Sequence, residues 1–272
     1  MELSFSALLL IIFNVGVSFL AFRDQGLFQK LLFQVNEVKA GQWYRLVSAG
    51  FLHVDWNHLF FNMFTFNFFA NSVSDVLGTG TMVAVYAGSL LGGNLLALLF
   101  NRNNPLYRAV GASGAVSGIV YASIALNPGM NLFLFFIPIP IPAWVFGVGF
   151  ILYSLYGMGK ANDNIGHEAH LGGAISGLLL TIAFFPAVIN SNPLTIIYIL
   201  VPAVVVFIVK LVKPQLLNLS QAQQHSAYNV DDAYRDKRAH KEQELNRILE
   251  KISTQGKDSL TQDEQQFLEK NQ

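Results

Sequence analysis

The chain has 272 residues, of which 53% are hydrophobic and only 12% are charged, and its formal net charge is zero. Soluble domains carry about a quarter charged residues, so this composition is typical of a membrane protein. The balanced charge gives no indication of a nucleic-acid partner, and the absence of cysteine excludes disulfides, thiolate metal sites and a cysteine nucleophile.

Six apolar runs in the first 186 residues have the composition of helices that enter or cross a bilayer. They cover residues 3–22, 58–76, 79–100, 113–126, 143–158 and 167–185. The first run lacks a basic segment before it and a small-residue cleavage site, which favours a retained span over a signal peptide. Residues 23–57 mix charges with aromatic side chains, and we expect a membrane-embedded interfacial loop there. Residues 1–186 are therefore predicted to form a core of six transmembrane helices.

The chain changes character after residue 186. Residues 187–213 contain a seventh apolar run, at 195–212, which predicts an additional transmembrane helix. Residues 214–230 form a polar linker in this interpretation, and residues 231–272 are predicted to form a small soluble helical hairpin. The hairpin is indicated by one apolar helical face, a helix-ending glycine and a capping box, at Leu245, Ile248, Leu249, Ile252, Gly256, Thr261 and Glu264. The predicted fold class is thus an all-α membrane protein with a soluble tail.

A serine between small residues opens the fourth run. Polar groups inside membrane helices are costly and therefore usually functional, which draws attention to Ser113 and to His170 near the start of the sixth run. The connections before these runs emerge on one membrane face, so the two side chains can meet at a shallow depth. Gly114 and Gly173 offer small faces for close helix approach. Since a histidine can activate a serine hydroxyl, the pair predicts a Ser–His nucleophilic dyad.

His58 and Asn62 begin the second run four residues apart, so they project from one helical face. Two neighbouring donors are what an acyl-transfer site needs to stabilise a developing oxyanion, and the Ser113 backbone N–H at a helix start is a third candidate. For Asn62 alone, a polar clamp between helices is an equally good explanation.

Two other interpretations of these residues stay open at this point. Glycine–serine faces are common packing surfaces in membrane helices. Residues 167–170 (HEAH) resemble the metalloprotease H-E-x-x-H motif, with His53 and His58 as further ligands, but the spacing is one residue too short. A metal site would also leave Ser113 without a purpose, so we expect no metal and no cofactor.

Five stretches, taken in order, resemble the rhomboid family of intramembrane serine proteases. They are WYR at 43–45, FLH at 51–53, HLFFNM at 58–63, GASG at 111–114 and AHLGG at 169–173. The resemblance covers residues 1–186 and implies a compact six-helix bundle around a water-filled cavity. It implies Ser113 as nucleophile, His170 as general base and acid, and His58, Asn62 and the Ser113 amide as the oxyanion site. Structural support is implied for Gly111, Gly114, Gly173 and Arg45, the last in holding the first connecting loop.

The chain departs from the family at one position, and two arguments about its orientation in the membrane disagree. Members often place a tyrosine four residues after the serine, stacked on the catalytic histidine, whereas this chain has Ser117 there. Lys and Arg gather on the predicted active-site face, which the positive-inside rule would place towards the cytoplasm. The resemblance implies the outer side, which we follow.

The sequence therefore predicts a multi-pass protein of the inner or plasma membrane that acts as an intramembrane serine endopeptidase. Its partners would be the lipid bilayer and transmembrane protein substrates, cut through an acyl-enzyme. The alternative is a catalytically silent rhomboid-like protein that binds membrane clients in quality control. A transporter would require charged or broken helices near the midplane, which the sequence does not clearly contain.

Overall fold

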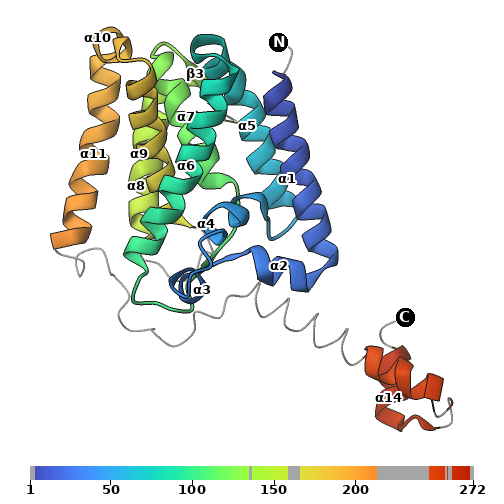
Figure 1. Cartoon of the computed structure of the whole chain (residues 1–272). Coiled ribbons are helices and arrows are strands. Elements are labelled where there is room, and N and C mark those ends of the chain that lie inside the picture. Colours follow the sequence, from blue (N-terminus) through green and yellow to red (C-terminus); the bar gives the residue numbers. More distant parts are fainter. Residues whose placement is uncertain are drawn as a thin grey trace. The chain divides into compact units, whose positions relative to one another are not determined.

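The computed structural model describes residues 4–134, 137–158, 166–212, 245–254, 256 and 259–269. They fall into two compact units, one within residues 1–227 and one within residues 228–272. The first unit is mostly helical (Figure 1). Its long helices are α1 (Phe5–Arg23), α5 (Trp56–Leu77), α6 (Thr79–Phe100), α7 (Ser113–Leu126), α8 (Ala143–Gly157), α9 (His167–Phe184) and α11 (Pro193–Val212). Each apolar run of the sequence thus forms a helix whose bounds lie within two residues of those expected.

Short polar residues begin two of these helices. The side chain of Ser4 accepts a hydrogen bond from the Ala7 amide at the start of α1. The carboxylate of Asp55 accepts one from the His58 amide, at 2.7 Å, at the start of α5. Both bonds satisfy amides that a helix leaves without an internal partner, which is the usual role of an N-cap. The Asp55 cap therefore fixes the first turn of α5, the turn that carries His58.

The segment between α1 and α5 is folded rather than extended. It contains α2 (Gln25–Leu31), β1 (Phe33–Gln34), α3 (Val35–Lys39), α4 (Arg45–Ser48) and the 3₁₀ turn η1 (Ala49–Phe51), and β1 pairs antiparallel with β2 (Arg108–Ala109). The Arg45 guanidinium is 6% exposed and donates to the carbonyl oxygens of Gln29 and Leu32 and to the Gln42 side chain, at 2.6–2.8 Å. One buried arginine therefore joins α2 to the start of α4.

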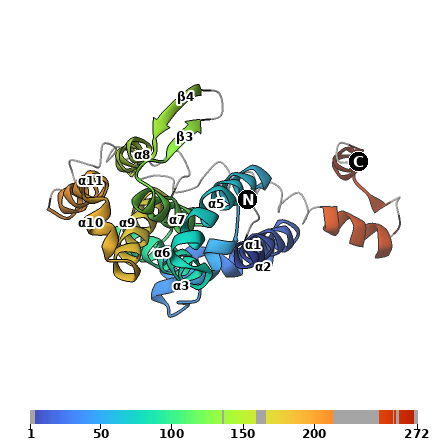
Figure 2. The ribbon, with the colours of Figure 1, turned by 90° about the horizontal axis from the view of Figure 1, so that it is seen from above.

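Helix α7 lies at the centre of the first unit. It packs against α5, α6 and α9, and every residue from Gly114 to Ala125 is buried. Seen from above, the other helices surround it (Figure 2). The contact with α9 is made by backbone: a side-chain carbon added at Gly173 would lie 2.6 Å from the carbonyl carbon of Gly114. Gly177 of α9 meets Gly118 of α7 in the same way, so small residues bring the two helices to the closest approach that backbones allow.

The all-α expectation is wrong in two places. Besides the short pair β1–β2, an antiparallel hairpin of β3 (Asn131–Leu134) and β4 (Ile137–Pro142) joins α7 to α8, and Figure 2 shows it extending beside α8. Prolines at every second position of β4 exclude a helix, because each lacks an N–H and its ring clashes with the preceding turn. Their alternation leaves the isoleucine N–H groups on the opposite edge, which can face β3.

A short helix, α10 (Ala187–Ser191), connects α9 to α11. Asn192, at its end, donates to the carbonyl oxygen of Ala125 at 2.8 Å. The connection is therefore fastened to the end of α7 before α11 begins.

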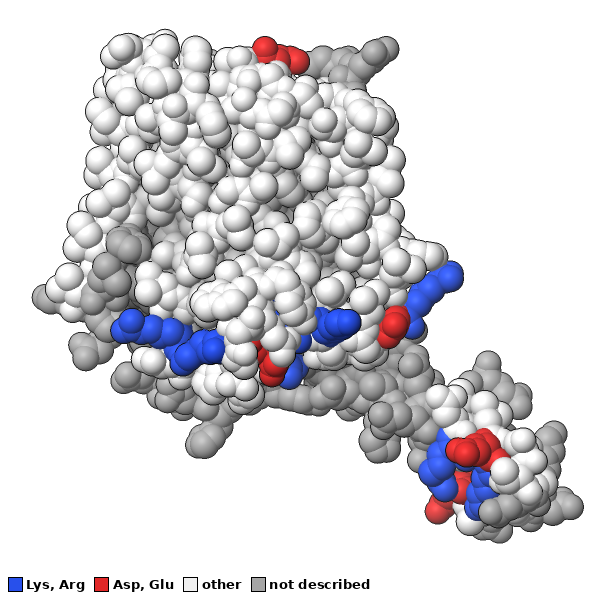
Figure 3. Space-filling model, in the orientation of Figure 1, with Lys and Arg blue, Asp and Glu red and all other residues white. Residues whose placement is uncertain are grey.

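Within the described residues, two helices are long and apolar enough to cross a bilayer by length and composition alone, α1 and α6. Helices α7 and α8 and residues 193–205 are apolar but shorter. On the face drawn in Figure 3, the Lys and Arg side chains of the first unit gather at one end. In the described part of the first unit, the exposed cations are Arg23, Lys30, Lys39, Arg102 and Arg108. Helices α7 and α9 both run away from this end (Figure 1), so the starts of both helices face the charged end.

The second unit contains the features expected of its sequence. Residues 245–254 are helical, and Gly256 follows with φ +81°, its N–H donating to Ile252 O at 2.9 Å. Helix α14 (Gln262–Glu269) opens with the predicted capping box. The Thr261 amide donates to the Glu264 carboxylate at 2.9 Å, and the Glu264 amide donates to Thr261 Oγ1 at 3.3 Å. Both the helix end and the capping box are therefore confirmed.

We predict that Gly173→Ala destabilises the first unit, because the added methyl group overlaps the Gly114 backbone and α7 and α9 must separate. Overpacking of this kind costs about 1–3 kcal/mol, measurable as a lower free energy of unfolding in detergent. The matched control is Gly149→Ala on α8, where an added carbon meets no atom within 4 Å. That change should be neutral or stabilising, since alanine is the better helix former. Equal effects of the two substitutions would contradict the backbone contact.

Candidate active site

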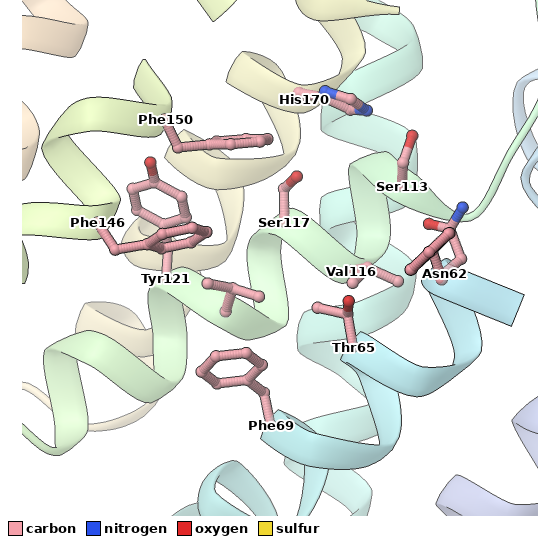
Figure 4. Close-up of a pocket in the computed structure, with 12 residues that line it drawn as sticks. Asn62, Thr65, Phe69, Ser113, Val116, Ser117, Tyr121, Phe146, Phe150 and His170 are labelled. Carbon is pink, nitrogen blue, oxygen red and sulfur yellow. The ribbon is translucent and has the colours of Figure 1, made fainter. Parts of the chain in front are cut away.

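A cavity of about 300 Å³ lies between α5, α7, α8 and α9 (Figure 4). Aromatic and aliphatic side chains form most of its wall, with a few polar groups among them. The lining residues are Phe61, Asn62, Thr65, Phe69, Ser113, Val116, Ser117, Val120, Tyr121, Phe146, Phe150 and His170. A mostly apolar cavity with a few converging polar groups is the usual form of a ligand or active site.

Ser113 and His170 come to this cavity from different helices. Ser113 is the first residue of α7, directly after the N-cap residue Ala112. His170 lies in the first turn of α9, where its amide donates to Gly166 O at 3.0 Å. In Figure 4 the Ser113 hydroxyl points toward the His170 ring. The close contact of α7 with α9 is what allows two residues 57 positions apart to line one wall.

Asn62 joins these two residues from α5. It is 7% exposed, and its Nδ2 donates to the carbonyl oxygen of His58 at 2.9 Å. An amide nitrogen carries two hydrogens, so this bond uses one of them. The orientation of the side chain is thereby fixed by its own helix while it faces the cavity.

His58 approaches Ser113 on the side of Gly111. A carbon added at Gly111 would lie 2.8–2.9 Å from Cε1 and Nε2 of the His58 ring and 3.7 Å from Ser113 Oγ. Gly111 has φ +125°, a left-handed conformation that favours glycine, and its amide donates to Ala49 O at 3.0 Å. Only a residue without a side chain fits between the imidazole and the serine, so the sequence-predicted residues Gly111, His58 and Ser113 do form one cluster.

His53 has a role that the sequence did not suggest. It is fully buried, and the Ala112 amide donates to its Nε2 at 3.4 Å. Nδ1 therefore carries the proton in the neutral ring and donates to Ser18 Oγ at 2.9 Å, while Ser18 donates to Phe51 O at 3.0 Å. Burial, with a smaller contribution from His58, lowers the pKa of His53 to about 3. The neutral ring thus links α1 to the residue before Ser113.

The same ring also contacts one of the predicted site residues. The centroids of His53 and His58 lie 5.0 Å apart with the rings at 72°, an edge-to-face arrangement. His53 therefore touches both sides of the Ser113 region, the α7 N-cap and the His58 ring. The resemblance to a known motif marked the position in the sequence, but its bonding pattern depends on Ser18, which no spacing rule connects with it.

Phe150 is a cavity residue that the sequence did not single out. Its ring centroid lies 5.5 Å from that of His170, and the planes are inclined by 31°. Helix α8 carries five aromatic side chains, at Trp144, Phe146, Phe150, Tyr153 and Tyr156. Their period does not indicate which of them meets a histidine on another helix, so no sequence signal could have identified the contact.

Both units match known protein families. The model of the rhomboid domain matches residues 40–187, more than half of the chain. Residues 228–271, within the second unit, match a family of unknown function (DUF6576).

Individual relatives agree with the first match. RHOMBOID-like protein 12, mitochondrial, from Arabidopsis thaliana is 30% identical over 182 residues, covering 61% of this chain and 54% of that protein. The putative rhomboid protease YdcA from Bacillus subtilis is 33% identical over 147 residues, covering 53% and 68%. Rhomboid protease GluP from the same bacterium is 29% identical over 148 residues, covering 54% and 27%. The chain spans about half the length of the first of these relatives, and it belongs to the rhomboid family of membrane proteins.

Proposed function

We propose that the chain is an intramembrane serine endopeptidase. The observation that carries the proposal is the cavity in which Ser113 of α7, His170 of α9 and Asn62 of α5 face one another. A nucleophile, a base and an amide donor from three helices are the minimum set for acyl transfer. Two bacterial relatives bear the name rhomboid protease, which supports the same reaction class.

In this mechanism Ser113 Oγ attacks the carbonyl carbon of a substrate peptide bond and His170 takes the hydroxyl proton. The negative charge that develops on the carbonyl oxygen is stabilised by the Ser113 amide and by the side chains of Asn62 and His58. His170 then gives its proton to the leaving amine as the C–N bond breaks. Water that enters the cavity hydrolyses the acyl-enzyme, with His170 again acting as base, and the hydroxyl of Ser113 is restored.

The substrate class follows from the surroundings of the cavity. Its wall is lined mainly by phenylalanine, valine and tyrosine side chains, and the unit lies in a membrane, so an apolar segment of another membrane protein is the chemistry that fits. A helical segment must unwind locally to present its carbonyl, since helical carbonyls are already hydrogen-bonded. In this proposal α1 and α5 to α9 form the six-helix core in the bilayer and α11 is the seventh helix beside it.

His53 acts in this proposal as a positioning residue. It holds the Ala112 amide and contacts the His58 ring, so it places the serine end of α7 and one oxyanion donor together. Because burial keeps the imidazole neutral, Nε2 stays available as an acceptor for the amide across the neutral pH range. Protonation would place a second donor opposite the amide and break this bond.

We predict that Ser113→Ala and His170→Gln each lower kcat for a model transmembrane substrate by at least about a thousandfold, since each removes one half of the nucleophilic pair. The measurement is cleavage in proteoliposomes, together with labelling of Ser113 by a fluorophosphonate. Ser123→Ala is the matched control, because this serine lies on the same helix but bonds to Ser72. It should cleave at the wild-type rate.

The same experiment separates the rival function. A wild-type protein that binds membrane clients but cleaves no faster than Ser113→Ala would identify a catalytically silent member of the family. Cleavage by Ser113→Ala at the wild-type rate would remove the dyad from the mechanism.

We predict that His53→Asn lowers kcat about tenfold while His53→Gln retains most of it. The glutamine oxygen can replace Nε2 as acceptor for the Ala112 amide, whereas asparagine replaces only the Nδ1 side of the ring. Both variants are compared with wild type by kcat and KM, and the proposal fails if the two behave alike.

The pH dependence of the free energy of unfolding should also depend on His53. A histidine with a pKa of 6.5 when unfolded and about 3 when folded binds more protons in the unfolded state between these values. The contribution of His53 to the free energy of unfolding therefore rises with pH from about 3 to 6.5, and it is complete above pH 6.5. Both His53 variants should lose this dependence, measurable by denaturation at several pH values.

A further inference from the structure

The imidazole of His170 ends a column of stacked rings that comes from α8. Phe146 and Phe150, one turn apart on α8, stack with centroids 6.2 Å apart and planes inclined by 21°. Phe150 in turn lies 5.5 Å from His170 at 31°, within the range of favourable aromatic contacts. All three side chains line the cavity (Figure 4), so the wall that α8 contributes is in continuous contact with the proposed base.

Helix α7 carries no ring at the position one turn after Ser113. Ser117 follows Ser113 by four residues and therefore lies on the same face of α7. It lines the cavity and is 6% exposed, but a hydroxymethyl group has no face on which an imidazole can stack. The Phe150 ring that packs on His170 thus belongs to a different helix from the proposed nucleophile.

Resting on the proposed function, we propose that Phe150 is the positioning residue of His170, so that α8 and not α7 supplies the ring that orients the base. A general base must keep its ring nitrogen aimed at the hydroxyl, and a side chain with two rotatable bonds does so only when its surroundings exclude other rotamers. Phe150 touches the imidazole and not the reacting atoms. Its loss should therefore lower kcat while substrate affinity changes little.

The position of α8 depends in turn on two neighbours. The Tyr121 hydroxyl of α7 donates to Gly147 O, and Trp144 packs against Tyr198 of α11 with centroids 5.1 Å apart. Helix α11 lies beyond the matched rhomboid domain. Trp144 therefore packs on the seventh helix, whereas Phe150 of the same helix α8 packs on His170.

The test compares Phe150→Leu, which keeps an apolar side chain but removes the ring, with Phe150→Tyr, which keeps the ring. We expect kcat and the rate of Ser113 labelling to fall about five- to tenfold in Phe150→Leu, with KM within about twofold of wild type and Phe150→Tyr close to wild type. Trp144→Leu is the matched control, because it removes a different aromatic ring of α8, one that packs on α11. It should lower the melting temperature without the same fall in kcat.

A second-site change addresses Ser117 directly. In the Phe150→Leu background, Ser117→Tyr adds a ring one turn after Ser113 on α7, and we expect it to raise the Ser113 labelling rate. If that rate does not rise, the idea that Phe150 of α8 supplies the ring that position 117 lacks is wrong. Wild-type kcat in Phe150→Leu, or an equal fall in kcat in Trp144→Leu, would overturn the proposal as a whole.

One readout is independent of activity. In protein with isotope-labelled histidine, the His170 ring proton signal, assigned through His170→Gln, should lie upfield in wild type and move downfield in Phe150→Leu as the ring current disappears. An unchanged signal would overturn the stacking. A wild-type protein that shows the shift but neither labels nor cleaves would instead overturn the proposed protease function and leave the contact in place.

Discussion

The contact between the backbones of α7 and α9 is the constraint on which the rest of the first unit depends. Lipid gives little drive for helices to associate, so close packing must supply the attraction. At Gly114 and Gly173 no side chain separates the two helices. The distance between α7 and α9 is therefore set by backbone atoms, which do not change rotamer. Ser113 and His170 lie in the first turns of the same two helices, so the distance between them is held by the same backbone contact.

The folded segment before α5 complements that contact from the other side. Arg45 joins its helices, Gly111 is bonded to η1, and His53 bonds to the N-cap of α7. These groups satisfy backbone atoms that would otherwise be buried without partners, which is costly in an apolar setting. The first turn of α7 is thus held by hydrogen bonds at its start, and the rest of the helix is held by glycine contacts along its length.

Sequence reasoning recovered the helices because long apolar runs and their glycines are local signals. It also brought Ser113, His170, Asn62 and His58 into one neighbourhood, since helix starts on one membrane face must share a depth. It missed the hairpin, where the prolines of β4 exclude a helix but do not indicate a partner strand. The contacts of Phe150 with His170 and of His53 with Ser18 were also missed, because they join side chains of separate helices and leave no periodicity.

Helix α7 has 14 residues and so measures about 21 Å, against a hydrocarbon layer of about 30 Å. A segment this short has no stable place in lipid by itself, and its burial on all sides means that α5, α6 and α9 must be present before it settles. The stable placement of this helix in a bilayer therefore depends on its packing against those three helices. On the proposed function, a chain whose helices have not yet packed would not hold Ser113 beside His170, so it would leave other membrane proteins uncleaved.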